Sequence, residues 1–375
     1  MKKENTDPYK HDSEIKEPDE IDKMNLSGRH GSHAISRRSF ITGTLSAVIA
    51  SRYAYSNAKP DNNESENNYD KPELKDITII DTHTHFYDPA RPIPEGRDRP
   101  VPWPAPKDKL LYKKILPPDW EAQAKPLGMR GTVVVEGGTP WLEDNDWILS
   151  LAERHKSIVG FIGNLSGTAI ESGKPVPVWD DINRFGQEVR RLERNRFFRG
   201  IRVGGRSISN DLTNRRYPHF ELLANAGLVT DVLNVPAEDI ISLAKALPAL
   251  IIIVDHMYGF KTELSSSEKW RGDIKAMGEH KNIVMKVSGF VEGCDSPQTD
   301  PDIALIQCRG ALDHVFQMFG SDRLVFGTNW PVSQPKGEMS VVKGIVYNYF
   351  SPKGNEVLAK VFAGNAKRVY KYLNR

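Results

Sequence analysis

Eight short apolar runs, separated by longer amphipathic stretches, are the feature of this 375-residue chain that most restricts its fold. Each run is apolar nearly throughout rather than at every second position, which is typical of parallel strands buried on both faces. The runs occupy residues 77–81, 131–137, 157–163, 198–203, 227–234, 250–256, 282–288 and 323–329. The segments between them are long enough for the crossover connections that parallel strands require.

Helical patterns fill most of these connections. Residues 142–155 begin with acidic side chains and place apolar residues on one face, and Pro236 and Pro248 mark the start and stop of another helix. Gly320 is suited to cap the helix that precedes it. Further helices are expected at 179–195, 301–320 and 355–374. Strands alternating with helices predict an α/β fold, a single-domain (β/α)8 TIM barrel over residues 76–375. A doubly wound sheet is disfavoured because no Gly-x-Gly-x-x-Gly follows the first strand.

The segment before the barrel has the composition of a targeting signal. Arg37 and Arg38 stand in "SRRSF" ahead of a short apolar run, 41–50, and a small-x-small pattern follows at 56–58. The run is shorter than the roughly 20 residues that span a bilayer. Residues 1–58 resemble a twin-arginine signal, which predicts export by the twin-arginine machinery to the periplasm. A basic amphipathic arm is the alternative, and residues 59–75 are expected to be a disordered linker.

The charge balance and the cysteines limit the classes of partner. A formal net charge of +2 gives no reason to propose nucleic acid or an anionic membrane as the main partner, so a small-molecule substrate is expected. Cys294 and Cys308 lack Cys-x-x-Cys spacing. Two separate thiols are favoured over a single disulfide, and the oligomeric state is left open.

A proline-rich segment, 86–120, interrupts the alternation after the first strand. Proline fixes the backbone and removes hydrogen-bond donors, so a stiff, irregular loop is expected. Loops that follow barrel strands lie over the catalytic face. The segment is therefore a candidate lid that carries Tyr87, Trp103 and Tyr112. The alternative is a surface excursion packed on the side of the barrel.

Two histidines, His83 and His85, follow the first apolar run. Residues two apart on a strand point to the same side, so both imidazoles are expected to face the mouth of the barrel. That arrangement suits two ligands of one metal ion, or two donors that polarise one carbonyl group.

Other strand ends carry further candidates. His256 ends the sixth strand, where a core histidine held by hydrogen bonds is the alternative to a functional one. Glu136 ends the second strand, the fourth contains Arg202, and Asn329 ends the eighth. A buried guanidinium without a partner is costly. Arg202 is therefore expected either to pair with an acidic neighbour such as Glu136 or to bind a substrate carboxylate.

Several segments together resemble the amidohydrolase-related (amidohydrolase 2) family, the predicted metal-dependent hydrolases of the TIM-barrel fold that include sugar-acid and pyrone-dicarboxylate lactonases. They are "IDTHTHFYDP", "GTVVVEGG", "FRGIRVGG", "IIIVDHMYG" and "LVFGTNWPVS". The resemblance implies that His83, His85 and His256 are catalytic and, where a metal such as zinc or manganese binds, its ligands. It also puts Asn329 where the family usually has an aspartate base. A carboxamide cannot take up a proton near neutral pH, and the fifth strand lacks a histidine, so a metal-free site stays open.

The favoured function is hydrolysis of a sugar-derived or carboxylated lactone. His83, His85 and His256 would polarise the carbonyl group, and Asn329 would orient water, with a histidine or Glu136 as base. The side chains expected to hold the substrate are Glu136, Arg202, Trp103, Tyr258 and Trp330. Two alternatives remain: a metal-dependent decarboxylase, and an exported binding barrel without catalysis.

Overall fold

The computed structural model describes residues 77–98, 103–137, 141–204, 217–372 and 374. All of them belong to one compact unit, Asp70–Arg375. The expected export signal and linker lie outside the described residues. A search of the described helices finds none with the length and apolar character of a membrane span.

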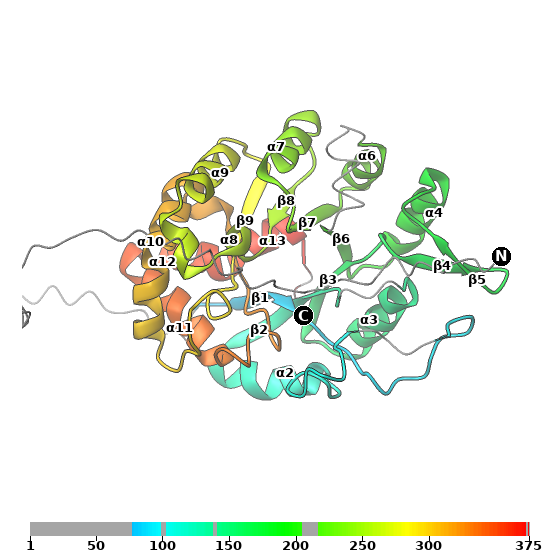
Figure 1. The fold of residues 1–375 in the computed structure, drawn as a ribbon, viewed down its shortest axis with the longest axis horizontal. Coiled ribbons are helices and arrows are strands. Elements are labelled where there is room, and N and C mark those ends of the chain that lie inside the picture. The colour runs from blue at the N-terminus through cyan, green and yellow to red at the C-terminus, as the bar shows by residue number, and fades with distance from the viewer. Residues whose placement is uncertain (1–76, 99–102, 138–140, 205–216, 373, 375) are drawn as a thin grey trace, which may run out of the picture. The chain divides into compact units, whose positions relative to one another are not determined.

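Eight parallel strands form a single sheet in which each strand pairs with the next along the chain (Figure 1). They are β1 (Ile79–Thr84), β2 (Met129–Val135), β3 (Ile158–Gly163), β6 (Phe198–Gly204), β7 (Val229–Leu233), β8 (Ile252–Val254), β9 (Ile283–Val287) and β10 (Leu324–Phe326). Every predicted strand is confirmed, although β8 and β10 are shorter than their apolar runs.

The sheet closes on itself where β10 meets β1. A single parallel bridge joins Thr84 to Trp330. Beside it, the Asp81 carboxylate accepts hydrogen bonds from the backbone N–H and the hydroxyl of Thr328, at 2.8 and 2.5 Å. The Thr82 hydroxyl donates to the Phe326 carbonyl at 2.7 Å. The result is a nearly closed barrel, and the predicted TIM-barrel fold is confirmed.

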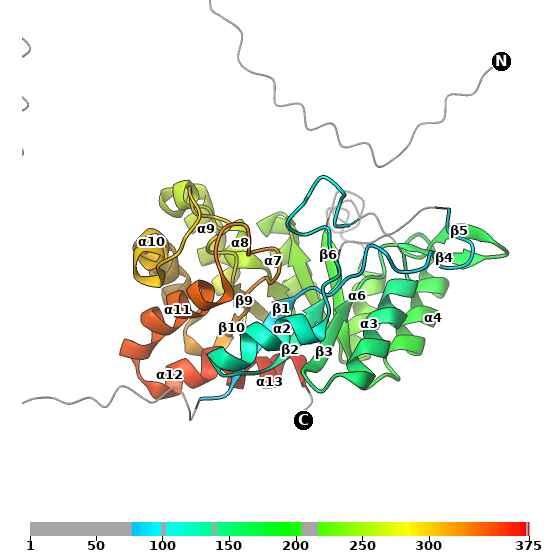
Figure 2. The ribbon, with the colours of Figure 1, turned by 90° about the horizontal axis from the view of Figure 1, so that it is seen from below.

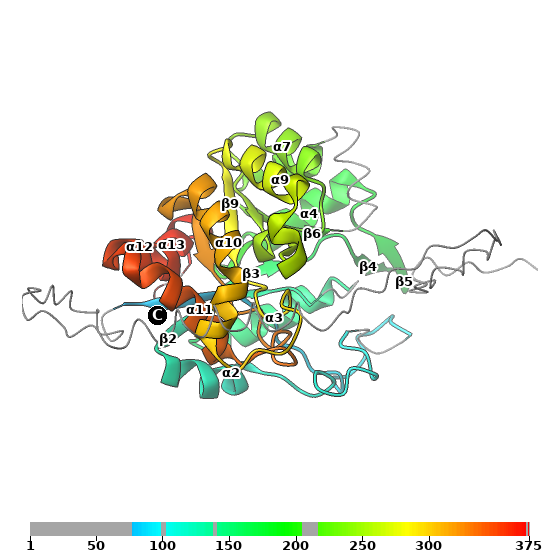
Figure 3. The ribbon, with the colours of Figure 1, turned by 60° about the vertical axis from the view of Figure 1, so that its left-hand side comes forward.

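The helices lie around the barrel, most of them on the outside of the strands (Figures 1 and 3). They are α2 (Pro117–Ala124), α3 (Glu143–Arg154), α4 (Ile182–Leu192), α6 (Pro218–Asn225), α7 (Ala237–Ala246), α8 (His256–Gly259), α9 (Glu268–Gly278), α10 (Pro301–Phe319), α11 (Met339–Phe350), α12 (Asn355–Ala359) and α13 (Asn365–Tyr370), with a π-helical turn, η6 (Lys360–Gly364), between the last two. The Asp300 side chain caps α10 by accepting from the N–H groups of Asp302 and Ile303. An antiparallel hairpin of β4 (Thr168–Glu171) and β5 (Lys174–Pro177) was not predicted.

The proline-rich segment is shorter than predicted, because α2 begins at Pro117. Two arginines attach its described first part to α3. Arg91 forms an ion pair with Asp144, and Arg97 Nη2 lies 2.7 Å from Glu143 Oε2. This part of the segment is therefore fixed to the first turn of α3, the helix that follows β2.

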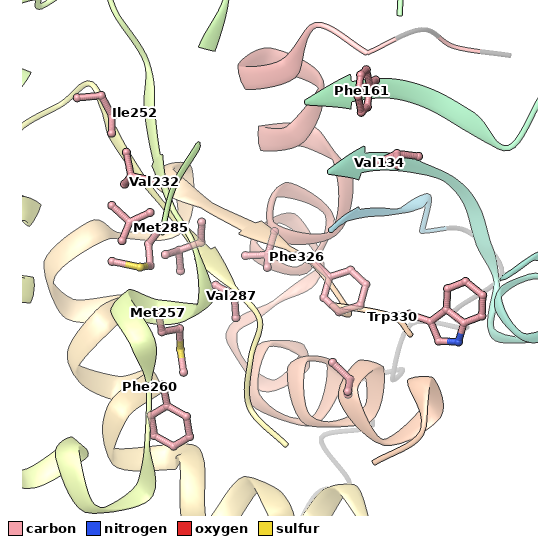
Figure 4. Packing of buried hydrophobic residues seen from close by; sticks show 14 of the residues in the cluster. Val134, Phe161, Val232, Ile252, Met257, Phe260, Met285, Val287, Phe326 and Trp330 are labelled. Carbon is pink, nitrogen blue, oxygen red and sulfur yellow. The ribbon is translucent and has the colours of Figure 1, made fainter. Parts of the chain in front are cut away.

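Alternation along the strands separates two apolar layers. Val134, Ile252, Met285 and Phe326 belong to the outer layer between strands and helices, which Figure 4 shows. Their neighbours in sequence face the interior; the inner layer contains Ile80, Val133, Val135, Val159, Ile162, Val229, Ile253, Val284 and Val325, together with Ala363, Ala366, Val369 and Tyr370. In Figure 2, α13 lies at the end of the barrel opposite the loop that follows β1. The apolar inner layer thus fills one end, and polar side chains occupy the other.

Candidate functional site

His83 and His85 face the same space at the mouth of the barrel. The register of β1 against β2 shifts between Asp81 and Thr84, so one extra residue turns the histidines inward. The ring centroids of His83 and His85 lie 5.0 Å apart, and those of His83 and His256 lie 4.5 Å apart. The structure therefore brings together three of the predicted residues from two distant strands.

Two glycines make room for these rings. A Cβ atom on Gly327 would lie 2.8 Å from the Cβ of His83, and one on Gly289 would lie 2.7 Å from the Cβ of His256. Contacts this short do not occur between real side chains, so any larger residue would displace a histidine.

His256 begins a turn with left-handed backbone. The φ angles of His256, Met257 and Tyr258 are 53°, 47° and 57°. This conformation costs roughly 1–2 kcal/mol for each residue that is not glycine. Met257 is fully buried in the outer apolar layer and anchors the turn (Figure 4). Backbone strain held by packing is typical of functional sites.

A buried lysine, Lys286, lies directly beneath the histidines. Its ammonium group is 2.5 Å from Asp231 Oδ2, 2.8 Å from Asp255 Oδ1 and 3.2 Å from His83 Nδ1. Burial opposes its charge, but the carboxylates of Asp231 and Asp255 outweigh burial and raise the pKa of Lys286 above its ordinary value. Burial likewise opposes ionisation of Asp255, but Lys286 and His83 outweigh it and hold the pKa of Asp255 well below its usual range. Both groups are therefore charged at neutral pH.

The three histidines are neutral at the same pH. Burial lowers the pKa of His85 to about 3, with a further contribution from Arg202. Burial also lowers the pKa of His256 to about 4, and burial with the nearby Lys286 lowers the pKa of His83 well below its usual range. Neutral imidazoles can each offer a nitrogen lone pair.

The donor set fits a divalent metal ion. His83, Asp255 and His256 each place a ligand atom within 4.8 Å of the others. His83 Nε2 is buried and has no hydrogen-bond partner in the described part of the chain. His256 Nδ1 lies 2.9 Å from the Ser288 hydroxyl, a contact that orients the ring and leaves Nε2 for a ligand. His85, which the sequence also suggested as a ligand, is not part of this group. Its Nδ1 lies 3.0 Å from the Val135 carbonyl.

Arg202 and Glu136 form an ion pair. Arg202 Nε lies 2.6 Å from Glu136 Oε1, and Nη2 donates to the Glu136 carbonyl at 2.9 Å. Of the two roles predicted for Arg202, the structure shows the pairing with Glu136.

Asn329 connects the histidines to a carboxyl group that the sequence did not suggest. Its Oδ1 lies 3.3 Å from His85 Nε2, and its Nδ2 donates to Glu292 Oε1 at 2.7 Å. Burial raises the pKa of Glu292 to about 7. The carboxamide therefore stands between an imidazole and an acid that titrates near neutrality.

The three predicted aromatic side chains have different surroundings. The Trp103 ring lies 5.6 Å from the His85 ring and 4.9 Å from that of Tyr87, so Trp103 covers the site. Trp330 is 1% exposed and packs against Phe86 in the outer apolar layer. The structure does not bring Trp330 to the site, because the residue after the inward-facing Asn329 points outward.

Tyr258 lines a pocket of about 310 Å³ at the ends of β7 and β8. Asp255 and Asn234 line the same pocket. One of the possible metal ligands, Asp255, therefore forms part of the wall of this pocket.

Sequence reasoning missed Asp231, Lys286 and Glu292. The signal for the first two was present, since each is a charged residue within an otherwise apolar strand, "LVTDVLN" and "IVMKVS". A buried charge needs a partner, and strands on one barrel can supply it. Glu292 lies in an irregular turn after β9, where nothing in the sequence gives its direction.

Comparison with known proteins finds similarity over most of the chain. The family model described as Amidohydrolase matches residues 80–372. The L-fucono-1,5-lactonase of Burkholderia ambifaria is 24% identical over 310 residues, which cover 78% of this chain and 95% of that protein.

Solved structures share the fold. A zinc-bound amidohydrolase from Burkholderia multivorans superposes with a TM-score of 0.63 at 19% identity, covering 79% of this chain and all of that one. A structure from Pseudomonas putida, described as a 2-pyrone-4,6-dicarboxylic acid hydrolase, gives a TM-score of 0.57 at 18% identity, with 80% and 99% covered. At these identities the structures show the fold alone.

Proposed function

The chain belongs to the amidohydrolase family, and on that premise we propose that it hydrolyses a lactone, a cyclic ester, of the sugar-derived kind. The observation that carries the proposal is the group of three neutral imidazoles at the mouth of the barrel, covered by Trp103. The similarity to a protein named as an L-fucono-1,5-lactonase supports the same substrate class.

In this proposal, His83 and His256 act on the lactone carbonyl group. Their rings lie 4.5 Å apart, close enough to contact one carbonyl oxygen together. Trp103 excludes water from one side, and Asn329 holds the attacking water. The histidines are poor bases, because the pKa values of His85 and His256 are about 3 and 4. Glu136, the other base that the sequence suggested, forms an ion pair with Arg202.

A metal ion is compatible with this reaction. His83, Asp255 and His256 would hold it, with His85 as the further ligand that the family resemblance implies. When bound, a divalent ion such as zinc or manganese would polarise the lactone carbonyl group.

The charges at the site favour an uncharged lactone over a carboxylated one. Arg202 is paired with Glu136, and Lys286 with Asp231 and Asp255. In the described part of the site, both cations are thus engaged by carboxylates. A substrate carboxylate would meet more negative than positive side chains there.

The test is a panel of sugar 1,5- and 1,4-lactones beside carboxylated lactones, followed by proton release with a pH indicator. Turnover of sugar lactones that is lost in His83→Ala is expected. Stabilisation of the protein by a lactone without turnover would instead support the binding barrel, which the Asn329 substitution makes the second candidate. Carbon dioxide release from carboxylated aromatics would support the decarboxylase.

We also propose that the chain is exported to the periplasm through the twin-arginine pathway. Arg37 and Arg38 followed by a short apolar run support this. Replacing both arginines by lysine is expected to retain the protein in the cytoplasm, measured by cell fractionation. Unchanged export would contradict the proposal.

A further inference from the structure

We propose that Glu292 is the general base of the hydrolysis and that Asn329 is the residue that positions it. The inference rests on the proposed lactone hydrolysis. It assigns the proton acceptor that this reaction requires and that Asn329 itself cannot be.

The contacts of the Glu292 carboxyl group suit this role. Oε1 accepts a hydrogen bond from Asn329 Nδ2 at 2.7 Å, which fixes the group. Oε2 is buried and has no hydrogen-bond partner among the described residues. The Oδ1 atom of Asn329 also lies 3.3 Å from His85 Nε2. The Asn329 carboxamide therefore lies between the Glu292 carboxyl group and the imidazole of His85. One oxygen is thus held in place, and the other is left for a water molecule.

The other carboxylates at the mouth are engaged by cations. Glu136 pairs with Arg202, and Asp231 and Asp255 pair with Lys286. Lys286 and His83 hold the pKa of Asp255 well below its usual range against burial, so Asp255 is a weak base. Burial raises the pKa of Asp231 to about 6, but its carboxylate oxygens accept hydrogen bonds from Lys286 and Tyr370 beneath the histidines. The Glu292 carboxyl group instead accepts hydrogen bonds from the uncharged Asn329 carboxamide and from the backbone, which reduce its basicity less than a cation would.

The electrostatic surroundings of Glu292 agree with the geometry. Burial raises its pKa to about 7, against hydrogen bonds from the backbone and from Asn329. Among the described residues, the Cys294 thiol interacts electrostatically with Glu292, and His85 lies beyond the Asn329 carboxamide. The pKa of His85 is about 3, so His85 does not titrate near neutrality. A hydrogen bond from Cys308 lowers the pKa of the Cys294 thiol. A base is most effective when its pKa is near the working pH.

The reaction balances with these groups. Glu292 takes a proton from water while the water oxygen forms a bond to the lactone carbonyl carbon. The bond from that carbon to the ring oxygen then breaks. The proton passes from Glu292 to the departing alkoxide, and Glu292 returns to its ionised form. The product is the open-chain hydroxy acid.

The experiment compares wild type, Glu292→Gln and the double variant Glu292→Gln/Asn329→Asp on the lactone that wild type hydrolyses best. Glutamine keeps the shape and an oxygen that accepts from Asn329 but cannot take a proton. We expect kcat to fall about 100-fold or more in Glu292→Gln, with KM nearly unchanged. The double variant places a carboxylate at position 329, the hydrogen-bond partner of residue 292. Its kcat is expected to be at least about 10-fold higher than that of Glu292→Gln.

The pH profile supplies a readout that a structural role would not change. In wild type, kcat/KM is expected to fall below a pKa near 7, because the base must be ionised. Glu292→Gln should lose this acid limb. Glu279→Gln, at the exposed residue that follows the end of α9, and Cys294→Ser are expected to keep it. Thermal unfolding of each variant shows whether it is folded.

The outcomes separate the two proposals. If wild type hydrolyses lactones and a folded Glu292→Gln retains the rate and the acid limb, the assignment of Glu292 is overturned and lactone hydrolysis stands. If wild type hydrolyses no lactone, both are overturned. A folded Glu292→Gln whose rate is strongly reduced, is not raised by Asn329→Asp and still shows the acid limb also overturns the assignment.

Discussion

The ammonium group of Lys286 lies 2.8 Å from Asp255, and Lys286 at the same time contacts Asp231. The three residues come from β9, from the end of β8 and from β7, so one cation joins three neighbouring strands. None of the three side chains is exposed to solvent. The charge balance of this triad is therefore an internal property of the barrel, and salt in the solvent screens it little.

Replacing Lys286 by Met should destabilise the protein strongly. Two carboxylates would lose their buried counter-charge, and breaking such a pair from one side costs about 3–5 kcal/mol. Urea unfolding measures the change. Lys269→Met is the matched control, since Lys269 pairs with Asp273 on the exposed surface of α9, where an ion pair contributes about 0–1 kcal/mol. If both variants lost the same free energy of unfolding, Lys286 would not be the counter-charge that stabilises Asp231 and Asp255.

Elemental analysis should detect a divalent ion in protein purified without chelator. His83→Ala and Asp255→Asn are each expected to reduce the metal content, because both residues belong to the group of possible ligands. Removing a ligand or its orienting partner typically costs 10-fold or more in affinity. His314→Ala is the control, as His314 bonds the Arg271 carbonyl away from the site. Metal retained in His83→Ala at the level of wild type would argue against this donor set.

Glu292 should make stability depend on pH even without substrate. Its pKa is raised from 4.5 to about 7 in the folded protein. The folded state therefore binds more protons than the unfolded state between these pH values. This stabilising contribution is complete below pH 4.5 and is lost as pH rises through 7. The side chain of Glu292→Gln stays neutral at every pH. Between pH 4.5 and 8, its free energy of unfolding should therefore rise relative to that of wild type by at most about 3 kcal/mol. A pH-independent difference between the two unfolding free energies would contradict the raised pKa.

Gly327→Ala should damage the site more than the fold. The new Cβ atom would lie 2.8 Å from that of His83, so His83 must move. We expect kcat/KM for the lactone to fall at least about 10-fold, with a stability loss of about 1–3 kcal/mol from overpacking. Gly310→Ala on α10 meets no atom within 4 Å and should stabilise the protein by up to about 1 kcal/mol. Full activity of Gly327→Ala would contradict the prediction that a side chain at this position displaces His83.

The sequence predicts the barrel well because its strands carry a strong signal. Runs such as 131–137 and 282–288 are apolar on both faces, and only a strand covered on both sides buries them. The hairpin at Thr168–Glu171 and Lys174–Pro177 was missed because both strands are short, partly exposed and carry no apolar alternation. The start of α2 was missed because its first two residues are prolines, which were attributed to the preceding loop.

The site was predicted in part for a related reason. His83, His85 and His256 end strands, so their positions follow from the fold. The pairing of Arg202 with Glu136 was one of two expected outcomes. The role of Glu292 depends on a turn whose path is set by tertiary packing, and the displacement of Trp330 depends on which way the chain turns after Asn329. Local sequence patterns do not encode either direction.

The last helix of the chain reaches the interior of the barrel, where the Tyr370 hydroxyl lies 3.3 Å from Asp231. Asp231 in turn holds the lysine beneath the histidines. The reactive end is thus supported by a residue of α13, whereas His83 and His85 come from β1 and the residue after it, far away in the sequence. The site is therefore complete only when these two distant segments have come together. Contacts between segments so far apart in sequence form slowly, so a finished site is expected late in folding.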